Sequence, residues 1–276
     1  MSVQQKVLPK EIMRFNRHQR YQHFLLALSV LMLVITGFPI KYGHWPWAQT
    51  VVNLFGSFQT MFMTHLVFAV VMLVSGAYHL AWMIGKFFRK ELSMSMVPTF
   101  KDVRDAIDHG KYLLGIRENP PEYGRYTYLE KFEYLAIYWG IIVMGGSGLI
   151  LWFPGLFGSL PRWILHIVRI AHTNEAFVAM LAVFTGHLFA VHLNPHVFPS
   201  SKVWLNGKIS REHMKEEHPL EYKEWFEEQK KAGVEIVEEE HHKKWVRSKP
   251  LIIFELLVYI AVFVLLLVSF IPLLFA

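Results

Sequence analysis

Five long apolar runs, separated by polar and charged segments, set the pattern of this 276-residue chain. The runs cover residues 22–40, 61–85, 132–152, 172–193 and 250–275. Each is close to the ~20 apolar residues that a helix needs to cross the hydrocarbon core of a bilayer. None of them alternates with period two, as the strands of a membrane barrel do. The pattern therefore predicts an all-α integral membrane protein whose spans are helices.

The segments between the runs predict the domain organisation and the topology. The expected parts are an N-terminal segment (1–21), a four-helix transmembrane core (22–194), a second hydrophilic segment (195–249) and a fifth, C-terminal transmembrane helix (250–275). Residues 1–21 and 86–131 are rich in lysine and arginine, whereas the loop 41–60 has one basic residue and a Trp-Pro-Trp cluster. The positive-inside rule then places the N-terminus in the cytoplasm of a bacterial inner membrane and the C-terminus in the periplasm.

Composition narrows the chemistry. Hydrophobic residues make up 53% of the chain and charged residues 18%, against about 25% charged in an average soluble domain. The net charge of +6 resides in the loops that flank the spans, so it indicates topology and not a nucleic-acid surface. The absence of cysteine excludes disulfides, iron–sulfur clusters and covalent c-type haem. Any haem must therefore be b-type and held by some of the 15 histidines.

Histidines inside the apolar runs are the candidate chemical groups, because ionisable side chains at membrane depth are costly and usually functional. His172 and His187 are 15 residues apart in the fourth run, which is roughly 22 Å along a helix. The topology puts His65 at the depth of His172 and His23 at the depth of His187. Two imidazoles at matched depth can ligate one haem iron from its two faces. We therefore expect two stacked haems b, held by His65 with His172 and by His23 with His187.

Two further histidines leave the ligand set open. His79 follows His65 by 14 residues, which returns to within ~40° of the same helix face, so it competes with His23 as the partner of His187. His192 lies about 140° around an α-helix from His187, which favours a haem propionate or a quinone as its neighbour. A third haem, held by His79 and His192, is a further alternative.

Other residues are assigned by position. Arg162 and Arg169 suit the propionates of the outer haem, since guanidinium groups pair well with carboxylates. A quinone beside the inner haem needs titratable or hydrogen-bonding groups. Candidates for this site or for propionate contacts are His18, Arg20, His79, Glu130, Tyr134 and His192. The cluster Gly145–Gly148 predicts the close approach of a helix or of a flat cofactor, and residues 102–114 predict an amphipathic helix on the membrane surface.

The order of several motifs adds a family resemblance. RHQRYQH leads into the first span and TGFP ends it; EKFEYLAIYWG and GLILWF bound the third; HTNEAFVAMLAVFTGHLFAVHLNP forms the fourth. Over about residues 14–200 the chain resembles the di-haem cytochrome b subunits of the formate dehydrogenase gamma and nickel–iron hydrogenase group. The resemblance implies a four-helix haem core whose ligands come from the first span, the second span and twice from the fourth. On this sequence these positions are His23, His65, His172 and His187.

The function predicted is a membrane-bound cytochrome b subunit without catalytic residues of its own. It would carry electrons between a quinone pool and a redox partner through two bis-histidine haems. The expected partners are membrane lipid, quinone or quinol, and an outer-face c-type cytochrome, iron–sulfur subunit or dehydrogenase subunit. The alternatives are a stand-alone membrane oxidoreductase of the cytochrome b561 type and a haem-free transporter. Transport paths usually bring intramembrane acids, and Glu175 is the only acid well inside the second to fourth spans.

Overall fold

The computed structural model describes residues 8–193 and 201–232, which fall into two compact units. The helical unit comprises Arg17–Leu92 and Leu135–Leu188. The polar unit comprises residues 8–16, 93–134, 189–193 and 201–232. The predicted fifth span, residues 250–275, lies outside the described residues, as do residues 195–200 and 233–249 of the predicted segment 195–249.

The described residues contain four helices that are long and apolar enough to cross a membrane, as predicted. They are α1 (Arg17–Lys41), α3 (Phe58–Phe88), α5 (Tyr128–Trp152) and α7 (Arg162–Leu181), which continues as the π-helices η1 (Ala182–His187) and η2 (Phe189–Leu193). Each begins before the predicted span. The difference is largest for the fourth span, which was predicted to begin at residue 172, after a loop over residues 153–171. Its helix begins at Arg162, so this prediction is wrong from Arg162 onward, and His172 lies within the helix instead of opening it.

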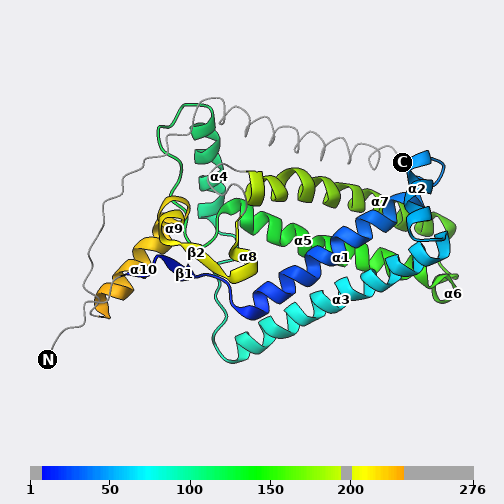
Figure 1. Cartoon of the computed structure of the whole chain (residues 1–276), viewed down its shortest axis with the longest axis horizontal. Helices are drawn as coiled ribbons and strands as arrows, with labels where there is room; N and C mark the ends of the chain where they lie inside the picture. Colours follow the sequence, from blue (N-terminus) through cyan, green and yellow to red (C-terminus); the bar gives the residue numbers. More distant parts are fainter. Residues whose placement is uncertain (1–7, 194–200, 233–276) are drawn as a thin grey trace. The chain divides into compact units, whose positions relative to one another are not determined.

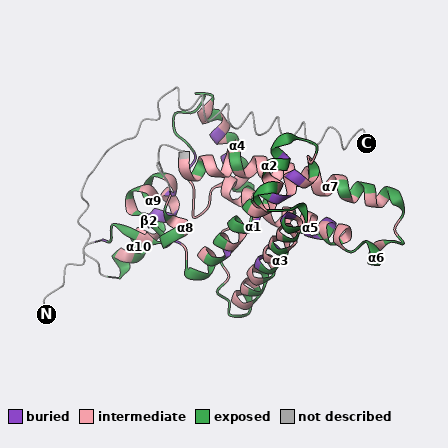
Figure 2. Cartoon of the chain, turned by 45° about the vertical axis from the view of Figure 1, so that its right-hand side comes forward, coloured by how far each residue is buried: buried purple, intermediate pink, exposed green. Residues whose placement is uncertain are grey.

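Buried residues are scattered along the long helices among intermediate and exposed ones (Figure 2). The buried ones are mostly small or polar, and the exposed ones include many large apolar residues. Ser29 and Thr36 of α1 are fully buried, and Ser75 and Ser147 are nearly so. This distribution is the inverse of that in a water-soluble bundle. It is expected where lipid covers the outside and small residues let helices approach closely.

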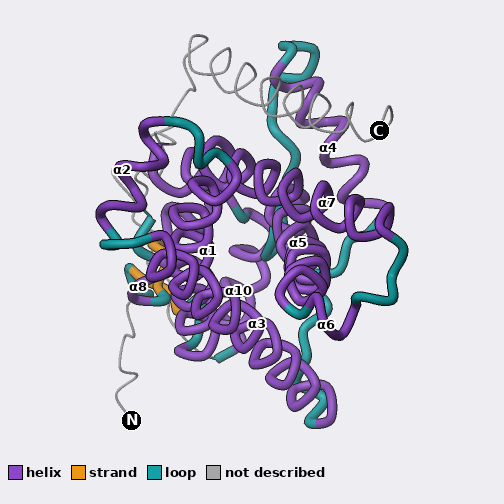
Figure 3. The backbone as a smooth tube through the Cα atoms, turned by 90° about the vertical axis from the view of Figure 1, so that its right-hand side faces the viewer, coloured by secondary structure: helices purple, strands orange, loops and turns teal. Residues whose placement is uncertain are grey.

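The helical unit is an up-down-up-down bundle in which each long helix contacts the next (Figures 1 and 3). Along each contact the residue numbers rise on one helix as they fall on the other, so neighbours are antiparallel. The linking contacts are Thr36–His65 for α1–α3, Leu73–Gly145 for α3–α5, Ser147–His172 for α5–α7 and Phe38–Phe177 for α1–α7. Two short helices follow α1 and α5: α2 (Pro46–Leu54) and α6 (Pro154–Phe157).

The polar unit contains a small sheet that the all-α prediction did not include. Strand β1 (Glu11–Met13) pairs antiparallel with β2 (Lys208–Ser210), with Ile12 opposite Ile209. The remaining elements are α4 (Phe100–Leu113), α8 (Val203–Asn206), α9 (Arg211–Glu217) and α10 (Pro219–Lys231). Ile209, Met214 and Tyr222 form its buried apolar cluster. The sequence interpretation missed the strands because three residues each are too short for a periodicity to be visible.

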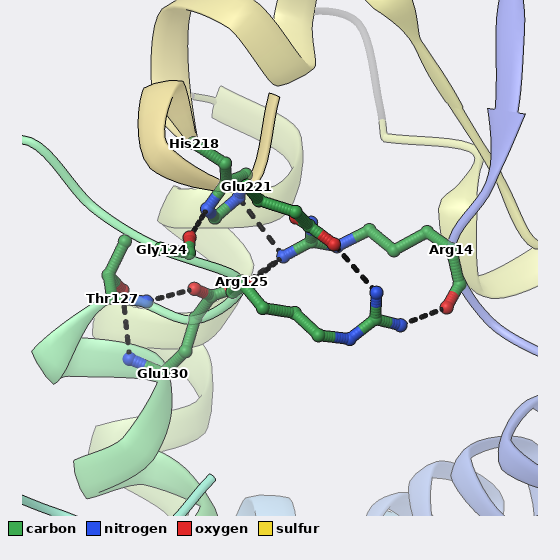
Figure 4. A network of polar contacts seen from close by, with 7 residues as sticks. All are labelled: Arg14, Gly124, Arg125, Thr127, Glu130, His218 and Glu221. Carbon is green, nitrogen blue, oxygen red and sulfur yellow. Dashed lines mark hydrogen bonds and ion pairs between the residues drawn. The ribbon is translucent and has the colours of Figure 1, made fainter. Parts of the chain in front are cut away.

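A buried ionic network joins residues 8–16, 93–134 and 201–232 of the polar unit (Figure 4). The carboxylate of Glu221 on α10 accepts hydrogen bonds from both Arg14 and Arg125, each at 2.6 Å. Each guanidinium also donates to the backbone carbonyl of the other arginine. The Arg14 side chain is only 4% exposed. Because a buried charge is tolerated only when it is paired, these contacts fix the segments together.

His218 completes the network and must be neutral to do so. Its Nδ1 lies 2.8 Å from the carbonyl oxygen of Gly124 and its Nε2 lies 3.1 Å from Nη2 of Arg14. A carbonyl requires Nδ1–H as donor, and a guanidinium requires Nε2 as acceptor. Burial, together with the charge of Arg14, lowers the pKa of His218 to about 4.

We expect the stability of the polar unit to fall as the pH drops from 7 to 4. The folded state keeps His218 neutral, whereas the unfolded chain protonates it near pH 6.5, so the unfolded state binds more protons throughout this window. The loss at pH 5 amounts to about 2 kcal/mol. Hydrogen exchange of the β2 and α9 amides in the full chain measures it, after correction for the intrinsic pH dependence. H218Q, which cannot titrate, should flatten the profile; an unchanged profile in H218Q contradicts the assignment.

Candidate haem-binding site

His65 and His172 come close together at the end of the bundle where α1 ends and α3 begins. They come from α3 and α7, which are not sequence neighbours, and they are close enough for their charged forms to repel each other. The structure therefore brings together the pair that the sequence predicted for the outer haem.

The same local device holds both of these histidines. A hydroxyl lies 2.9 Å from each Nδ1: Thr36 of α1 for His65 and Ser147 of α5 for His172. The next residue in each case is a glycine against the Cε1 edge of the ring. A Cβ added at Gly37 would lie 3.1 Å from His65 Cε1, and one at Gly148 would lie 3.2 Å from His172 Cε1. Each ring is therefore held by a hydroxyl–glycine pair on a neighbouring helix.

The contacts of these hydroxyls favour one tautomer of each histidine. Thr36 donates its hydroxyl hydrogen to the carbonyl of Met32 at 2.7 Å, and Ser147 donates to that of Val143 at 2.5 Å. With its single hydrogen used, each oxygen can only accept from the histidine. Nδ1–H is then the donor, and the lone pair of Nε2 is left available. This is the tautomer that a metal-ligating histidine needs, with its second nitrogen oriented by a hydrogen bond.

His23 and His187 meet at the opposite end of the bundle, where α1 begins and the fourth long helix ends. Their ring centroids are 6.1 Å apart and their planes are tilted by 46°. Two imidazoles bound through one nitrogen each to opposite sides of one iron have centroids roughly 6 Å apart, since each metal–nitrogen bond is about 2 Å. The observed separation fits this requirement.

His79 contacts other residues at this end of the bundle. One of its ring nitrogens lies 2.8 Å from Oε1 of Gln22, and its ring packs on Tyr138 at a centroid distance of 5.0 Å. The geometry thus favours His23 over His79 as the partner of His187. Gln22 and Tyr138 had no role in the sequence interpretation, because an amide and a phenol inside an apolar run carry no ligand signal of their own.

The segment with His187 and His192 departs from α-helical geometry. Residues Ala182–His187 and Phe189–Leu193 are π-helical, with i to i+5 hydrogen bonding such as Leu188 N–H to the carbonyl of Val183. The angle of about 140° between His187 and His192 assumed a regular α-helix, so that assumption is wrong here. π-Helical segments are rare and occur frequently at functional sites. His192 is half-buried in η2.

The remaining candidates take different positions. Arg162 and Arg169 are exposed on α7, and Arg20 is half-buried on α1. Glu130 forms a reciprocal cap with Thr127: its carboxylate accepts from the Thr127 N–H at 2.7 Å, and its own N–H donates to the Thr127 hydroxyl at 3.1 Å. It also lies 3.8 Å from Arg14. This engagement gives Glu130 a structural role in starting α5. Tyr134 is half-buried two turns into the same helix.

Thr36, Gly37 and Ser147 are the site residues that the sequence interpretation missed as ligand supports. Their signal was present: a hydroxyl residue followed by glycine occurs in both the first and the third apolar run. Its meaning depends on which histidine lies opposite, and the sequence does not contain that pairing. The close helix approach predicted for Gly145–Gly148 is confirmed, since a Cβ at Gly145 would lie 2.7 Å from Leu73.

A comparison with known proteins places these residues in a family. The family model described as "Prokaryotic cytochrome b561" matches residues 14–204, which include the four long helices and both histidine pairs. The chain belongs to the prokaryotic cytochrome b561 family. Its membership confirms the predicted membrane-bound b-type cytochrome with haem b, and it agrees with the predicted likeness to cytochromes of the formate dehydrogenase gamma group.

Curated relatives extend the comparison along almost the whole of their own length. Three proteins named "Formate dehydrogenase, nitrate-inducible, cytochrome b556(Fdn) subunit" match, from Escherichia coli K12, Escherichia coli O157:H7 and Shigella flexneri. Each is 22% identical over 231 residues, which is 84% of this chain and 97% of the relative. The match therefore covers these relatives as whole proteins.

The donor set of this cytochrome b561-family chain fits haem and does not resemble a bare metal site. Among residues 8–193 and 201–232, no three histidine, cysteine or acidic side chains gather to hold a metal ion. Histidines occur in facing pairs instead. Two axial imidazoles suffice for haem, because the porphyrin supplies the other four ligands.

We expect T36V to weaken haem binding at the His65/His172 pair while leaving the fold intact. Valine has the shape of threonine but cannot accept from Nδ1–H, so the ring loses its orientation. Loss of such a supporting hydrogen bond typically costs about 10–100-fold in metal affinity. Haem retention during dialysis against apomyoglobin measures the change. T64V is the matched control, since Thr64 is a half-buried threonine of α3 whose hydroxyl donates to the Thr60 carbonyl at 2.8 Å. Equal retention in both variants contradicts the role of Thr36.

Proposed function

We propose that this protein is an electron-transfer subunit that exchanges electrons with a quinone pool and carries them across the membrane through two haems b. The single observation that carries the proposal is the presence of two facing histidine pairs at opposite ends of one antiparallel bundle. His65 with His172 would hold one haem, and His23 with His187 the other. Haem b supplies one-electron transfer when bound. The chain supplies the ligands, their orientation and an apolar environment.

The proposal includes a topology. The basic residues of 1–21 and 86–131 favour the cytoplasmic side for the N-terminus and for the loop between α3 and α5. The His23/His187 pair is then the inner one and the His65/His172 pair the outer one. With four spans the chain is back on the cytoplasmic side after α7, and a fifth span over residues 250–275 would put the C-terminus in the periplasm.

A hydrogen-bonded histidine–tyrosine pair suits the proposed quinone site. Nδ1 of His18 lies 2.6 Å from the hydroxyl of Tyr78, and His18 precedes the ligand candidate His23 by about one and a half turns on α1. Quinone reduction takes up protons together with electrons, so it needs a proton-carrying group at hydrogen-bond reach. Imidazole and phenol are two such groups, and His18 is exposed.

The redox partner is proposed to be a dehydrogenase assembly. The named relatives are cytochrome subunits of a formate dehydrogenase and match this chain over nearly their whole length. By this likeness the chain would be the cytochrome subunit of a larger dehydrogenase assembly and would receive electrons from a partner chain. The alternative of a stand-alone oxidoreductase differs in one observable: such a protein would purify as active without partner chains.

Haem stoichiometry and quinol reactivity test the proposal. The purified chain should give two haems b per polypeptide in a pyridine haemochrome assay and a reduced b-type band upon addition of a quinol. Y78F should slow the quinol-driven reduction while dithionite still reduces the same amount of haem, because dithionite needs no proton-relay group. A chain that binds no haem after haem-supplemented expression refutes the function. Equal quinol rates in Y78F and wild type refute the quinone site alone.

A further inference from the structure

Helix α4 (Phe100–Leu113) shows an inverted distribution of exposure that the proposed electron transfer does not use. Its polar side is turned into the polar unit, where Asp105 and His109 are only 7% and 6% exposed. Its apolar side is turned outward: Phe100 is 92% exposed, Val103 61% and Ile107 55%. These three residues follow the i, i+3, i+7 spacing of one helix face. A helix packed for water alone would carry the opposite arrangement.

Specific contacts hold the polar side in place and fix this orientation. Nζ of Lys131 lies 2.8 Å from Asp102, and Nδ1 of His109 lies 2.8 Å from the hydroxyl of Tyr128. Burial by itself would raise the pKa of Asp102, but the hydrogen bonds from Lys131 and Thr99 outweigh it and lower the pKa, so the carboxylate stays charged. The apolar face therefore cannot turn inward without breaking these contacts.

The residues that anchor α4 lie at the start of α5. Tyr128 and Lys131 belong to the first turn of α5, which is a candidate membrane span. α4 is thus fastened to the N-terminal turn of a candidate membrane span. Links of 11 residues from α3 and 14 residues to α5 connect it on both sides to candidate spans.

The basic residues of α4 complete a lipid-facing pattern. Arg104 and Lys111 are exposed and lie, at 100° per residue, within about 40° of Phe100 on the same flank of the apolar face. Arginine and lysine at the border of an apolar face favour contact with anionic headgroups, and the apolar residues bury into the headgroup–acyl boundary. Lys111 also pairs with Asp108 at 3.6 Å, a contact that leaves its positive charge at the surface.

We propose that the apolar face of α4 (Phe100, Val103 and Ile107) inserts into the interface of an anionic phospholipid membrane and thereby holds the polar unit on the membrane surface. The inference is independent of the haems and of the quinone site. It requires only that α5 crosses the membrane. It assigns a membrane-inserting face to the amphipathic helix expected from residues 102–114, and it names the contacts that orient this face.

The experiment uses the absence of cysteine in the chain, which makes any introduced cysteine a unique labelling site. Spin labels are attached to I107C and, as the matched control, to K223C, an exposed position on α10. The full chain is placed in nanodiscs of phosphatidylcholine with or without phosphatidylglycerol. Power saturation compares the accessibility of each label to oxygen, which partitions into lipid, and to a nickel chelate, which stays in water.

We expect the oxygen-to-nickel accessibility ratio at I107C to exceed that at K223C by at least about threefold, as for a label buried several ångströms below the headgroups. R104Q/K111Q should reduce the ratio in discs with phosphatidylglycerol and leave it unchanged without this lipid. A nickel-accessible label at I107C would show a water-facing helix and overturn the proposal. A label shielded from both reagents would show a protein occupant and also overturn it. The unperturbed label at K223C verifies that each variant is folded.

Discussion

Replacing His187 by alanine is expected to halve the haem content, from two haems per chain to one. The ring of His187 is 6.1 Å from that of His23, so the substitution removes one of the two axial ligands of the proposed inner haem and leaves the His65/His172 pair at the other end of the bundle. A single remaining histidine does not retain a bis-histidine haem through purification. Pyridine haemochrome content and the reduced b-type band measure the loss.

The competing ligand provides the control. H79A should retain both haems, because His79 is hydrogen-bonded to Gln22 and packed on Tyr138, whereas the ring of His23 lies 6.1 Å from that of His187. H23A should behave like H187A, since the two residues belong to one pair. If H79A loses a haem and H23A keeps two, the inner pair is His79 with His187 and the present assignment is wrong. Haem loss in all three variants would support a third haem.

Replacing Glu221 by glutamine is expected to destabilise the polar unit by about 3 kcal/mol, since removing one partner of a buried ion pair leaves uncompensated charge. The substitution is nearly isosteric, but it leaves the Arg14 and Arg125 guanidiniums facing each other around a neutral amide. Burial alone would lower the pKa of Arg125, but nearby Tyr126 and Glu221 outweigh it and raise this pKa, so the Arg125 guanidinium stays charged.

Hydrogen exchange of the full chain in detergent measures this loss. Amides of β1, β2 and α10 should lose about 100-fold in protection, the equivalent of 3 kcal/mol at 1.4 kcal/mol per factor of ten. E224Q is the matched control, because Glu224 is an exposed carboxylate on the same helix one turn away. Equal protection in E221Q and E224Q would show that the network contributes no net stability.

The spans, the histidine pairs and the helix ends could be predicted from the sequence to different extents. The four spans could be predicted because a run of about 20 apolar residues has few other solutions. The depths of His65, His172, His23 and His187 followed from helix rise and from alternating direction. Helix ends were less predictable: the fourth apolar run was predicted to begin at residue 172, but its helix begins at Arg162, because Arg162, His166 and Arg169 interrupt the apolar run without ending the helix.

The support of the histidines could not be predicted in the same way. The hydroxyl–glycine pairs Thr36–Gly37 and Ser147–Gly148 have a role only because α1 packs on α3 and α5 on α7. The π-helical stretch that carries His187 and His192 has no composition signal, because the change from i+4 to i+5 hydrogen bonding responds to surrounding packing.

The sequence by itself determined the membrane class and the four described spans, and it predicted which histidines share one end of the bundle, because hydrophobic run length and helix rise are local properties. Only the tertiary structure decided which groups meet. It placed His79 on Gln22, set Thr36 and Ser147 against Nδ1 of His65 and His172, and joined Arg14, Arg125 and Glu221 from three distant segments. These pairings depend on the rotation and register of packed helices and strands, and a one-dimensional pattern does not contain either quantity.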